Sequence, residues 1–152
     1  MPTALVAHLL SPDPDAAAAA LAGDVRFASP FADYADRERI AGLFAVMPRV
    51  FDELTAVREL RGPDGERATV LHGRIGDHAA DAILDERYDG NGLAREILLL
   101  LRPYAAVKEA IRRMGELLGE RRRGPAPVQP LPGAARPNTS REGASKPMSS
   151  RS

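Results

Sequence analysis

The sequence from Arg67 to Arg102 reads RATVLHGRIGDHAADAILDERYDGNGLAREILLLLR, in which apolar runs alternate with short turns. The turns are rich in Gly, Asp and Asn, which favour tight reversals of the chain. With the residues just before it, this stretch predicts four strands: Val50–Leu60, Arg67–Ile75, Ala80–Tyr88 and Ala94–Arg102. Long strands joined by short turns form an antiparallel meander. In the last strand five apolar residues follow one another from Ile97 to Leu101, so we expect both of its faces to be covered.

Helices are predicted both before and after this meander in the sequence. The preceding elements are a helix over Thr3–Leu10, an Ala-rich helix over Asp15–Ala22 that ends at Gly23, a strand over Val25–Ser29 and a helix over Asp36–Val46. Asp13 before Pro14 is the pattern of a helix N-cap followed by the first helical residue. After the meander, Pro103 begins a helix with one apolar stripe, formed by Val107, Ile111, Met114, Leu117 and Leu118. Elements in this order predict an α+β domain over residues 1–120.

The charges are unevenly distributed along the chain. Its 152 residues carry 21 basic and 21 acidic side chains, but residues 121–152 hold seven of the basic residues and one acidic residue. An acidic body does not favour contacts with phosphates, so we expect no nucleic-acid binding through residues 1–120. Residues 121–152 also contain six of the 13 prolines and few apolar residues, which predicts a disordered basic tail. Contact of this tail with an acidic partner, such as nucleic acid or a membrane surface, is the alternative.

Several kinds of site lack the residues they need. The absence of cysteine excludes disulfides, thiolate metal sites and cysteine nucleophiles. The three histidines are not spaced to place several ligands on one face, so no metal site is expected. No glycine-rich loop follows a strand and opens a helix, so we expect no cofactor. No apolar run approaches the roughly 20 residues of a membrane span, and no signal peptide is evident, so we expect a cytoplasmic protein.

Three motifs carry a resemblance to a known family. They are Asp24–Pro30 (DVRFASP), the turn Asp89–Leu93 (DGNGL), and Arg102-Pro103 after the last apolar strand. With the order of the predicted elements, they make residues 3–118 similar to the SnoaL-like branch of the nuclear-transport-factor-2-like (NTF2-like) superfamily. This resemblance implies an α+β cone, in which a curved antiparallel sheet wraps around N-terminal helices and encloses a pocket. Many members dimerise through the outer face of the sheet, which implies a homodimer here.

The ketosteroid isomerases of this superfamily use an aspartate base, a tyrosine and a protonated aspartate. The resemblance places Ser29, Leu5 and Leu84 at these three positions. Leucine neither donates a proton nor titrates, and an unassisted serine is a poor base near neutral pH. We therefore expect no catalysis by this apparatus, unless a shift of one residue brings Asp85 to the second aspartate position.

A different acid–base pair is predicted on the meander. The resemblance directs two sets of side chains inward, each spaced by two as strand geometry requires: Val70, His72 and Arg74, then Ala82, Leu84 and Glu86. If the hairpin is centred near Ala79, His72 lies opposite Glu86, with Cβ atoms about 5 Å apart. Such a pair can exchange a proton with a ligand, and Arg74 can bind a ligand oxygen. In the alternatives, these side chains only orient a ligand, form an inert polar network, or face solvent after a one-residue shift in register.

The candidate ligand contacts are apolar residues and residues near the Ser-Pro turn: Phe27, Ser29, Tyr34, Phe44, Val70, Arg74, Leu84, Ile97, Leu99 and Leu101. Tyr34 either supplies a hydroxyl at the pocket rim or lies in a surface loop. The first candidate function is binding of a small apolar or polycyclic, polyketide-like molecule, with His72 and Glu86 as the candidates for acid–base catalysis of the isomerase, cyclase or dehydratase type. The second is a non-catalytic dimeric binding or assembly module, whose pocket is filled by its own side chains.

Overall fold

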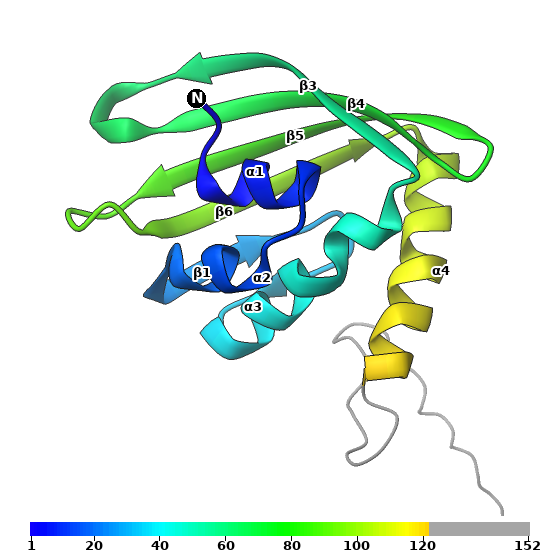
Figure 1. Ribbon diagram of the computed structural model, residues 1–152, viewed down its shortest axis with the longest axis horizontal. Coiled ribbons are helices and arrows are strands. Elements are labelled where there is room, and N and C mark those ends of the chain that lie inside the picture. Colours follow the sequence, from blue (N-terminus) through cyan, green and yellow to red (C-terminus); the bar gives the residue numbers. More distant parts are fainter. Residues whose placement is uncertain (122–152) are drawn as a thin grey trace, which may run out of the picture. The chain divides into compact units, whose positions relative to one another are not determined.

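The computed structural model describes residues 1–121, which carry a sheet and four helices (Figure 1). In chain order, its elements are α1 (Ala4–Leu10), α2 (Pro14–Ala19), β1 (Leu21–Ala28), β2 (Asp33–Tyr34), α3 (Arg37–Val46), the 3₁₀ turn η1 (Met47–Val50), β3 (Glu53–Arg61), the 3₁₀ turn η2 (Pro63–Gly65), β4 (Arg67–Ile75), β5 (His78–Tyr88), β6 (Ala94–Arg102) and α4 (Tyr104–Arg121). The tail predicted over residues 121–152 lies outside the described residues, except for Arg121 at the end of α4. None of the helices within residues 1–121 is long and apolar enough to cross a membrane.

The six strands form a single mixed sheet in the order β2-β1-β6-β5-β4-β3. The four strands β3 to β6 form the predicted antiparallel meander, and β1 pairs with β6 in parallel. The sheet is curved, with α1, α2 and α3 on one face and α4 beside one end of the strands (Figure 1). We call the face that carries α1 to α3 the inner face and the opposite face the outer face.

The first part of β1 was predicted as helix, and this prediction is wrong. Helix α2 ends at Ala19, and β1 begins at Leu21, which pairs with Ala94 of β6. Leu21 and the following Ala22 are buried in the core. Pairing with the sheet and burial of Leu21 therefore outweigh the helix propensity of the alanines before it. Gly23, the predicted helix end, lies inside the strand.

Each N-terminal helix begins with a side chain that caps it. Asp13 accepts a hydrogen bond from the backbone of Ala16, and Pro14 is the first helical residue, as predicted. Thr3 caps α1 in the same way, through a hydrogen bond from Val6. These caps satisfy backbone donors that a helix leaves unpaired at its start. They also fix Thr3 at the edge of the inner face.

The register between β4 and β5 differs from the prediction. Ile75 pairs with His78, so the turn consists of Gly76 and Asp77 alone, with a φ of +62° at Gly76. A two-residue turn with glycine in this conformation is typical of a tight hairpin. The hairpin is therefore centred two to three residues before Ala79, and His72 lies opposite Asp81. On β5 the residues that were predicted to face inward, Ala82, Leu84 and Glu86, do so. On β4 the prediction is wrong, because Val70, His72 and Arg74 lie on the outer face.

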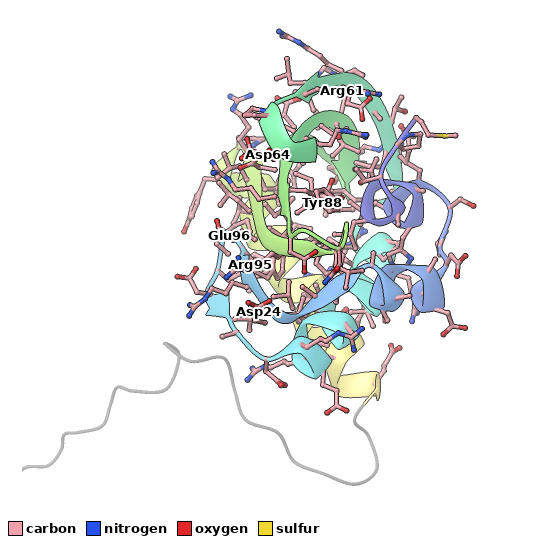
Figure 2. The ribbon with its side chains drawn as sticks, turned by 90° about the vertical axis from the view of Figure 1, so that its left-hand side faces the viewer. Asp24, Arg61, Asp64, Tyr88, Arg95 and Glu96 are labelled. Atoms are coloured by element: carbon pink, nitrogen blue, oxygen red, sulfur yellow. The ribbon has the colours of Figure 1, made fainter. Side chains whose placement is uncertain are left out.

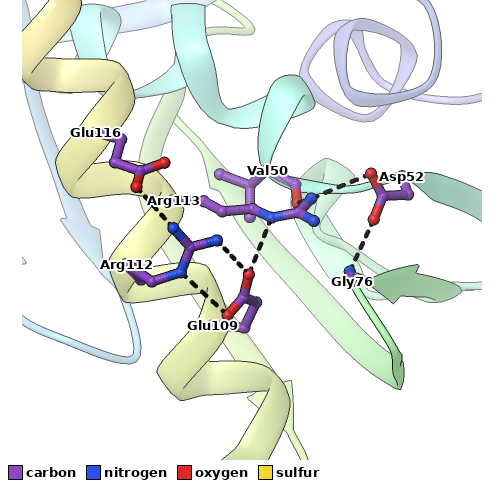
Figure 3. Close-up of polar contacts among 7 residues, drawn as sticks. All are labelled: Val50, Asp52, Gly76, Glu109, Arg112, Arg113 and Glu116. Carbon is purple, nitrogen blue, oxygen red and sulfur yellow. Dashed lines mark hydrogen bonds and ion pairs between the residues drawn. The ribbon is translucent and has the colours of Figure 1, made fainter.

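Helix α4 packs by a stripe that is rotated from the predicted one. Met114 and Leu117 are buried as expected, but Ile111 is 43% exposed, and the small residues Ala106 and Ala110 are buried instead. Arg113 joins the helix to η1, because its Nη1 donates to the carbonyl of Val50 at 2.9 Å (Figure 3). Close packing of the helix on the ends of β4 to β6 favours the small side chains at this contact.

The outer face of β6 is uncovered within the described chain. Leu98 and Leu100 are 37% and 50% exposed, and Ile83 beside them on β5 is 36% exposed. The prediction that both faces of β6 are covered therefore does not hold for residues 1–121 taken alone. A row of exposed branched side chains on a sheet is an apolar surface that another molecule can cover.

Candidate functional site

The predicted pair of His72 with Glu86 is wrong. The side chain of His72 is 59% exposed on the outer face, where its Nε2 lies 3.5 Å from Oδ1 of Asp81. Arg74 lies on the same face and forms an ion pair with Glu53. The alternative in which these side chains face solvent is therefore correct for His72 and Arg74, although the register of β4 differs from the prediction by more than one residue. It is the short turn after β4 that sets this register.

Glu86 is on the inner face, as predicted, and its side chain is 0% exposed. The hydroxyl of Tyr88 donates to its Oε1 at 2.6 Å, and the hydroxyl of Thr3 donates to its Oε2 at 2.8 Å. Tyr88 follows Glu86 by two residues along β5, so both side chains extend from the same face of the strand. Tyr88 and Thr3 are half-buried, whereas Glu86 is fully buried. The two hydroxyl residues therefore lie between the carboxyl and the solvent.

Arg67 completes the group that we call the Glu86 cluster: Glu86, Tyr88, Thr3 and Arg67. Arg67 is directly opposite Glu86 in the β4–β5 register. Its guanidinium is directed elsewhere, since Nη1 lies 2.8 Å from Oε2 of Glu59 on β3 and donates to the carbonyl of Met1 at 3.2 Å. In the view of Figure 2, Tyr88 appears between the β3–β4 turn, which Asp64 marks, and β1. The cluster is thus at the end of the inner face from which the β5–β6 turn extends.

The surroundings of Glu86 shift its carboxyl toward the protonated form, relative to a carboxyl in water. Burial raises the pKa of Glu86, and this effect exceeds the opposing effects of hydrogen bonds from Tyr88 and Thr3 and of the Arg67 charge. Burial also raises the pKa of Tyr88, and its hydrogen bond to Glu86 adds to this. A buried carboxyl that keeps its proton can donate a hydrogen bond to an oxygen that gains negative charge during a reaction.

Most of the predicted apolar contacts form the core. Phe27, Phe44, Leu84, Ile97 and Leu99 are buried, and Leu101 is half-buried. The ring centroids of Phe27 and Phe44 lie 5.0 Å apart, and Tyr34 stacks on Phe27 at 6.1 Å. Tyr34 is therefore a buried residue of β2, and the interpretation as a surface-loop tyrosine is wrong. Around Phe27 the interior is filled by the protein's own side chains.

Ser29 is part of a turn. Its hydroxyl donates to the carbonyl of Ala32 at 2.9 Å and accepts hydrogen bonds from the amides of Phe31 and Ala32, both at 3.1 Å. This turn reverses the chain between β1 and β2. These local contacts of the hydroxyl explain why a serine stands before Pro30.

A groove of about 560 Å³ lies on the outer face. Its lining consists of Arg26, Phe27, Ala28, Asp33, Tyr34, Asp85, Arg87, Glu96, Ile97 and Leu98. Arg26, Glu96 and Arg87 form one row across β1, β6 and β5, so charges of both signs border the groove. Leu98 belongs both to the groove and to the exposed apolar row of β6. The groove and this row therefore form one continuous surface.

Sequence reasoning identified Glu86 but missed its partners. The spacing of Glu86 and Tyr88 by two residues was a usable signal, since it places both on one face of a strand. Thr3 is distant from Glu86 in sequence, and only the packing of α1 on the sheet brings the two together. Glu59 reaches Arg67 across the β3–β4 hairpin, which the sequence predicted without indicating this ion pair.

No protein-family model matches the sequence, and no curated protein matches it. Solved structures do. A steroid delta-isomerase from Pseudomonas aeruginosa aligns with a TM-score of 0.71 at 22% identity, covering 76% of this chain and 87% of that one. An uncharacterized protein with a cystatin-like fold from Silicibacter pomeroyi aligns with a TM-score of 0.68 at 22% identity, covering 75% and 84%. An NTF2-like protein of unknown function from Cytophaga hutchinsonii aligns with a TM-score of 0.57 at 12% identity, covering 68% and 88%.

The chain has an NTF2-like fold. The predicted α+β cone is thus confirmed, with N-terminal helices against a curved sheet and a helix after the last strand. At these identities the likeness concerns the NTF2-like fold alone, because one fold supports many unrelated activities. The ligand and the chemistry must be inferred from the side chains.

Proposed function

We propose that this NTF2-like protein binds a small, mainly apolar molecule that carries an oxygen atom, at the end of the inner face where the Glu86 cluster lies. The observation that carries this proposal is the fully buried Glu86 carboxyl, held by hydroxyls of Tyr88 and Thr3. An isolated buried acid is costly, so such groups are frequent at functional sites. A ligand at this end of the sheet meets the Tyr88 hydroxyl first, with the Glu86 carboxyl behind it.

The chemistry of the cluster suits proton donation to a ligand oxygen. When a ligand binds, the Tyr88 hydroxyl turns its proton from Glu86 to the ligand oxygen. The protonated Glu86 carboxyl, 2.6 Å from the Tyr88 oxygen, then donates to that oxygen and passes its own proton on as Tyr88 releases one to the ligand, which leaves Glu86 as a carboxylate. Isomerisation, cyclisation and dehydration of carbonyl compounds all require such a donor, because negative charge develops on oxygen. The steroid delta-isomerase among the similar structures supports a ligand with fused rings. Such a compound, steroid-like or polyketide-like, is the ligand class that we propose.

Thermal unfolding of the full chain with matched probes tests this proposal. The probes are pairs of ring compounds that differ by one oxygen, such as 2-naphthol and naphthalene. A ligand at 100 times its dissociation constant stabilises the folded state by about 2.7 kcal/mol. We expect 2-naphthol to raise the midpoint more than naphthalene, and Tyr88→Phe to remove this difference. His72→Ala, on the outer face, serves as the control and should keep it. Equal shifts by both probes, or no shift, would contradict the proposal.

A second candidate function is a non-catalytic dimeric module, and the exposed row of Leu98, Leu100 and Ile83 favours it. Charged pairs flank this row, among them Arg102 with Asp81 at 2.7 Å. In a symmetric dimer the same patch meets itself, so a surface with an apolar centre and charges of both signs is self-complementary. The filled interior around Phe27 is also consistent with a protein that acts through its surface.

Sedimentation velocity tests the dimer. The proposed interface predicts a dimer for the unmodified chain and a monomer for Leu100→Glu, which places a charge in the apolar row. Val57→Glu is the matched control, because Val57 is also 50% exposed but lies on β3, outside this row. A dimer that survives Leu100→Glu, or a monomeric unmodified chain, would exclude this interface. A dimer that binds none of the ring compounds would favour the second function over the first.

A further inference from the structure

Glu59 stands between two arginines beside the Glu86 cluster. Its Oε2 lies 2.8 Å from Nη1 of Arg67, and its Oε1 lies 3.7 Å from Nη2 of Arg61. Arg61 and Arg67 are direct partners across β3 and β4, so their like charges face each other. Glu59 therefore both neutralises this pair of arginines and fixes the direction of the Arg67 side chain.

This direction matters because Arg67 is also the direct partner of Glu86 across β4 and β5. Side chains in this position have Cβ atoms about 5 Å apart, well within the reach of an arginine. Even so, the carboxyl of Glu86 receives hydrogen bonds from two hydroxyls, and the Arg67 guanidinium is bound to Glu59. The choice of partner by Arg67 thus decides whether Glu86 faces a cation or neutral donors.

We infer that Glu59 is a positioning residue, which holds the Arg67 guanidinium toward β3 and leaves the Glu86 carboxyl to hydroxyl partners alone. This inference rests on the proposed function of the Glu86 cluster. It adds a residue that does not touch the ligand but sets the protonation of Glu86, the acid behind the Tyr88 hydroxyl that does. The carbonyl of Met1 also accepts from Arg67, at 3.2 Å, but a neutral, exposed acceptor holds a guanidinium less strongly than a carboxylate does.

The surroundings of Glu86 contain few other charges. Beside the hydroxyls of Tyr88 and Thr3, the groups that act on it are Arg67 and the carboxylate of Asp85, its neighbour along β5. Its partner on β6 is the apolar Ile97. Removal of Glu59 leaves Arg67 facing the like charge of Arg61, and Glu86 is then the carboxylate directly across the strand pair. We expect Arg67 to turn to Glu86 and to stabilise its ionised form.

Carbon-13 NMR titration of the full chain, labelled at the glutamate carboxyls, tests this inference. Glu86→Gln assigns the Glu86 signal. The variants form a cycle: the unmodified chain, Glu59→Ala, Arg67→Ala and the double variant. We expect Glu59→Ala to lower the pKa of Glu86 by about 1 to 3 pH units, the usual effect of a cation at close range. In the Arg67→Ala background, removal of Glu59 should have little further effect.

Glu53→Ala is the matched control, because Glu53 lies on the same strand and pairs with Arg74 on the outer face. It should leave the Glu86 titration unchanged. The inference is overturned if Glu59→Ala leaves the pKa of Glu86 unchanged, or lowers it equally with and without Arg67. The proposed function fails in a different way, namely if Glu86 of the unmodified chain titrates like an exposed carboxyl. The two failures are therefore read from different samples of one experiment.

Discussion

The hydroxyl of Tyr88 lies 2.6 Å from Oε1 of Glu86, and both side chains extend from the inner face of β5. The carboxyl is shielded completely from solvent, whereas the tyrosine is half-buried. A buried acid behind a partly accessible tyrosine hydroxyl can pass a proton to a ligand through that hydroxyl. This relationship underlies our proposal for the protein and leads to a prediction about its stability.

The stability of the protein should depend on pH through Glu86. Burial raises the folded-state pKa of this carboxyl above its ordinary value of 4.5. The folded state therefore holds the proton more tightly than the unfolded chain does, and this contribution to stability is complete below pH 4.5. It is lost as the pH rises through the raised pKa. Glu86→Gln cannot ionise, so its free energy of unfolding should increase relative to the unmodified chain as the pH rises.

Urea unfolding of both proteins between pH 4 and pH 8 measures this difference. Val57→Ala, which removes an exposed side chain of β3 that does not titrate, controls for a general effect of substitution. A difference between Glu86→Gln and the unmodified chain that stays constant over this range would show that the carboxyl has the same affinity for protons in both states.

His8 should contribute to stability as a hydrogen-bonded core residue. It is 1% exposed, its Nε2 lies 2.6 Å from the carbonyl of Phe44, and its Nδ1 accepts from the amide of Asp13 at 2.8 Å. The ring thus joins α1 to the end of α3 and to the start of α2. His8→Ala leaves two backbone groups unpaired and a cavity, so we expect a loss of about 2 to 4 kcal/mol in urea unfolding. A loss below about 0.5 kcal/mol, the usual range of surface substitutions, would contradict this role.

Arg113 should hold α4 to the turn between β4 and β5. It contacts Asp52 at 3.1 Å, and the other oxygen of Asp52 accepts from the amide of Gly76 at 2.7 Å (Figure 3). These contacts hold the pKa of Asp52 below its usual value. We expect Arg113→Ala to speed hydrogen exchange at the Gly76 amide.

Arg112 provides the matched control for this experiment. Its ion pairs, with Glu109 and Glu116, stay within α4. Arg112→Ala should therefore leave exchange at Gly76 unchanged. Equal acceleration by both substitutions would indicate a general loosening of the helix, and would count against a specific connection through Asp52.

Two glycines in strands should respond differently to alanine. A Cβ at Gly73 would overlap the backbone carbonyl of Glu53 on β3, whereas one at Gly23 would meet nothing within 4 Å. Gly73→Ala should lower the free energy of unfolding by about 1 to 3 kcal/mol, because the paired strands must move apart. Gly23→Ala should be neutral or stabilising by up to about 1 kcal/mol, since it restricts the unfolded chain. Similar losses in both variants would show that the close approach of β3 to Gly73 has no energetic effect.

Local patterns in the sequence predicted the four strands of the meander and the Asp13 cap of α2, but not the short strand β2. The bounds of β4 and β6 agree with the prediction, because turn residues flank both strands. The prediction of which β4 side chains face inward was wrong. The turn after Ile75 has only two residues, which sets a register other than the predicted one, and side chains alternate between the two faces of a strand. The strand character of Leu21 and Ala22 was also missed, because it depends on pairing with β6 rather than on local propensity.

The candidate site was only half predictable for the same reason. The alternation along β5 puts Glu86 on the same face as Leu84, and the resemblance made this the inner face. This prediction held. The prediction that Glu86 pairs with His72 also required the register between β4 and β5, which depends on the length of the turn that joins them. The true partners comprise a strand neighbour, Tyr88, and a helix cap, Thr3, that only the packing of α1 brings to the carboxyl.

Amide NMR of the full chain during titration with 2-naphthol tests the central proposal most directly. The account predicts that chemical shifts change around Thr3, Glu86 and Tyr88, and that Tyr88→Phe weakens binding. Changes confined to the outer groove at Arg26 and Leu98, or no saturable change at all, would contradict a ligand site at the Glu86 cluster.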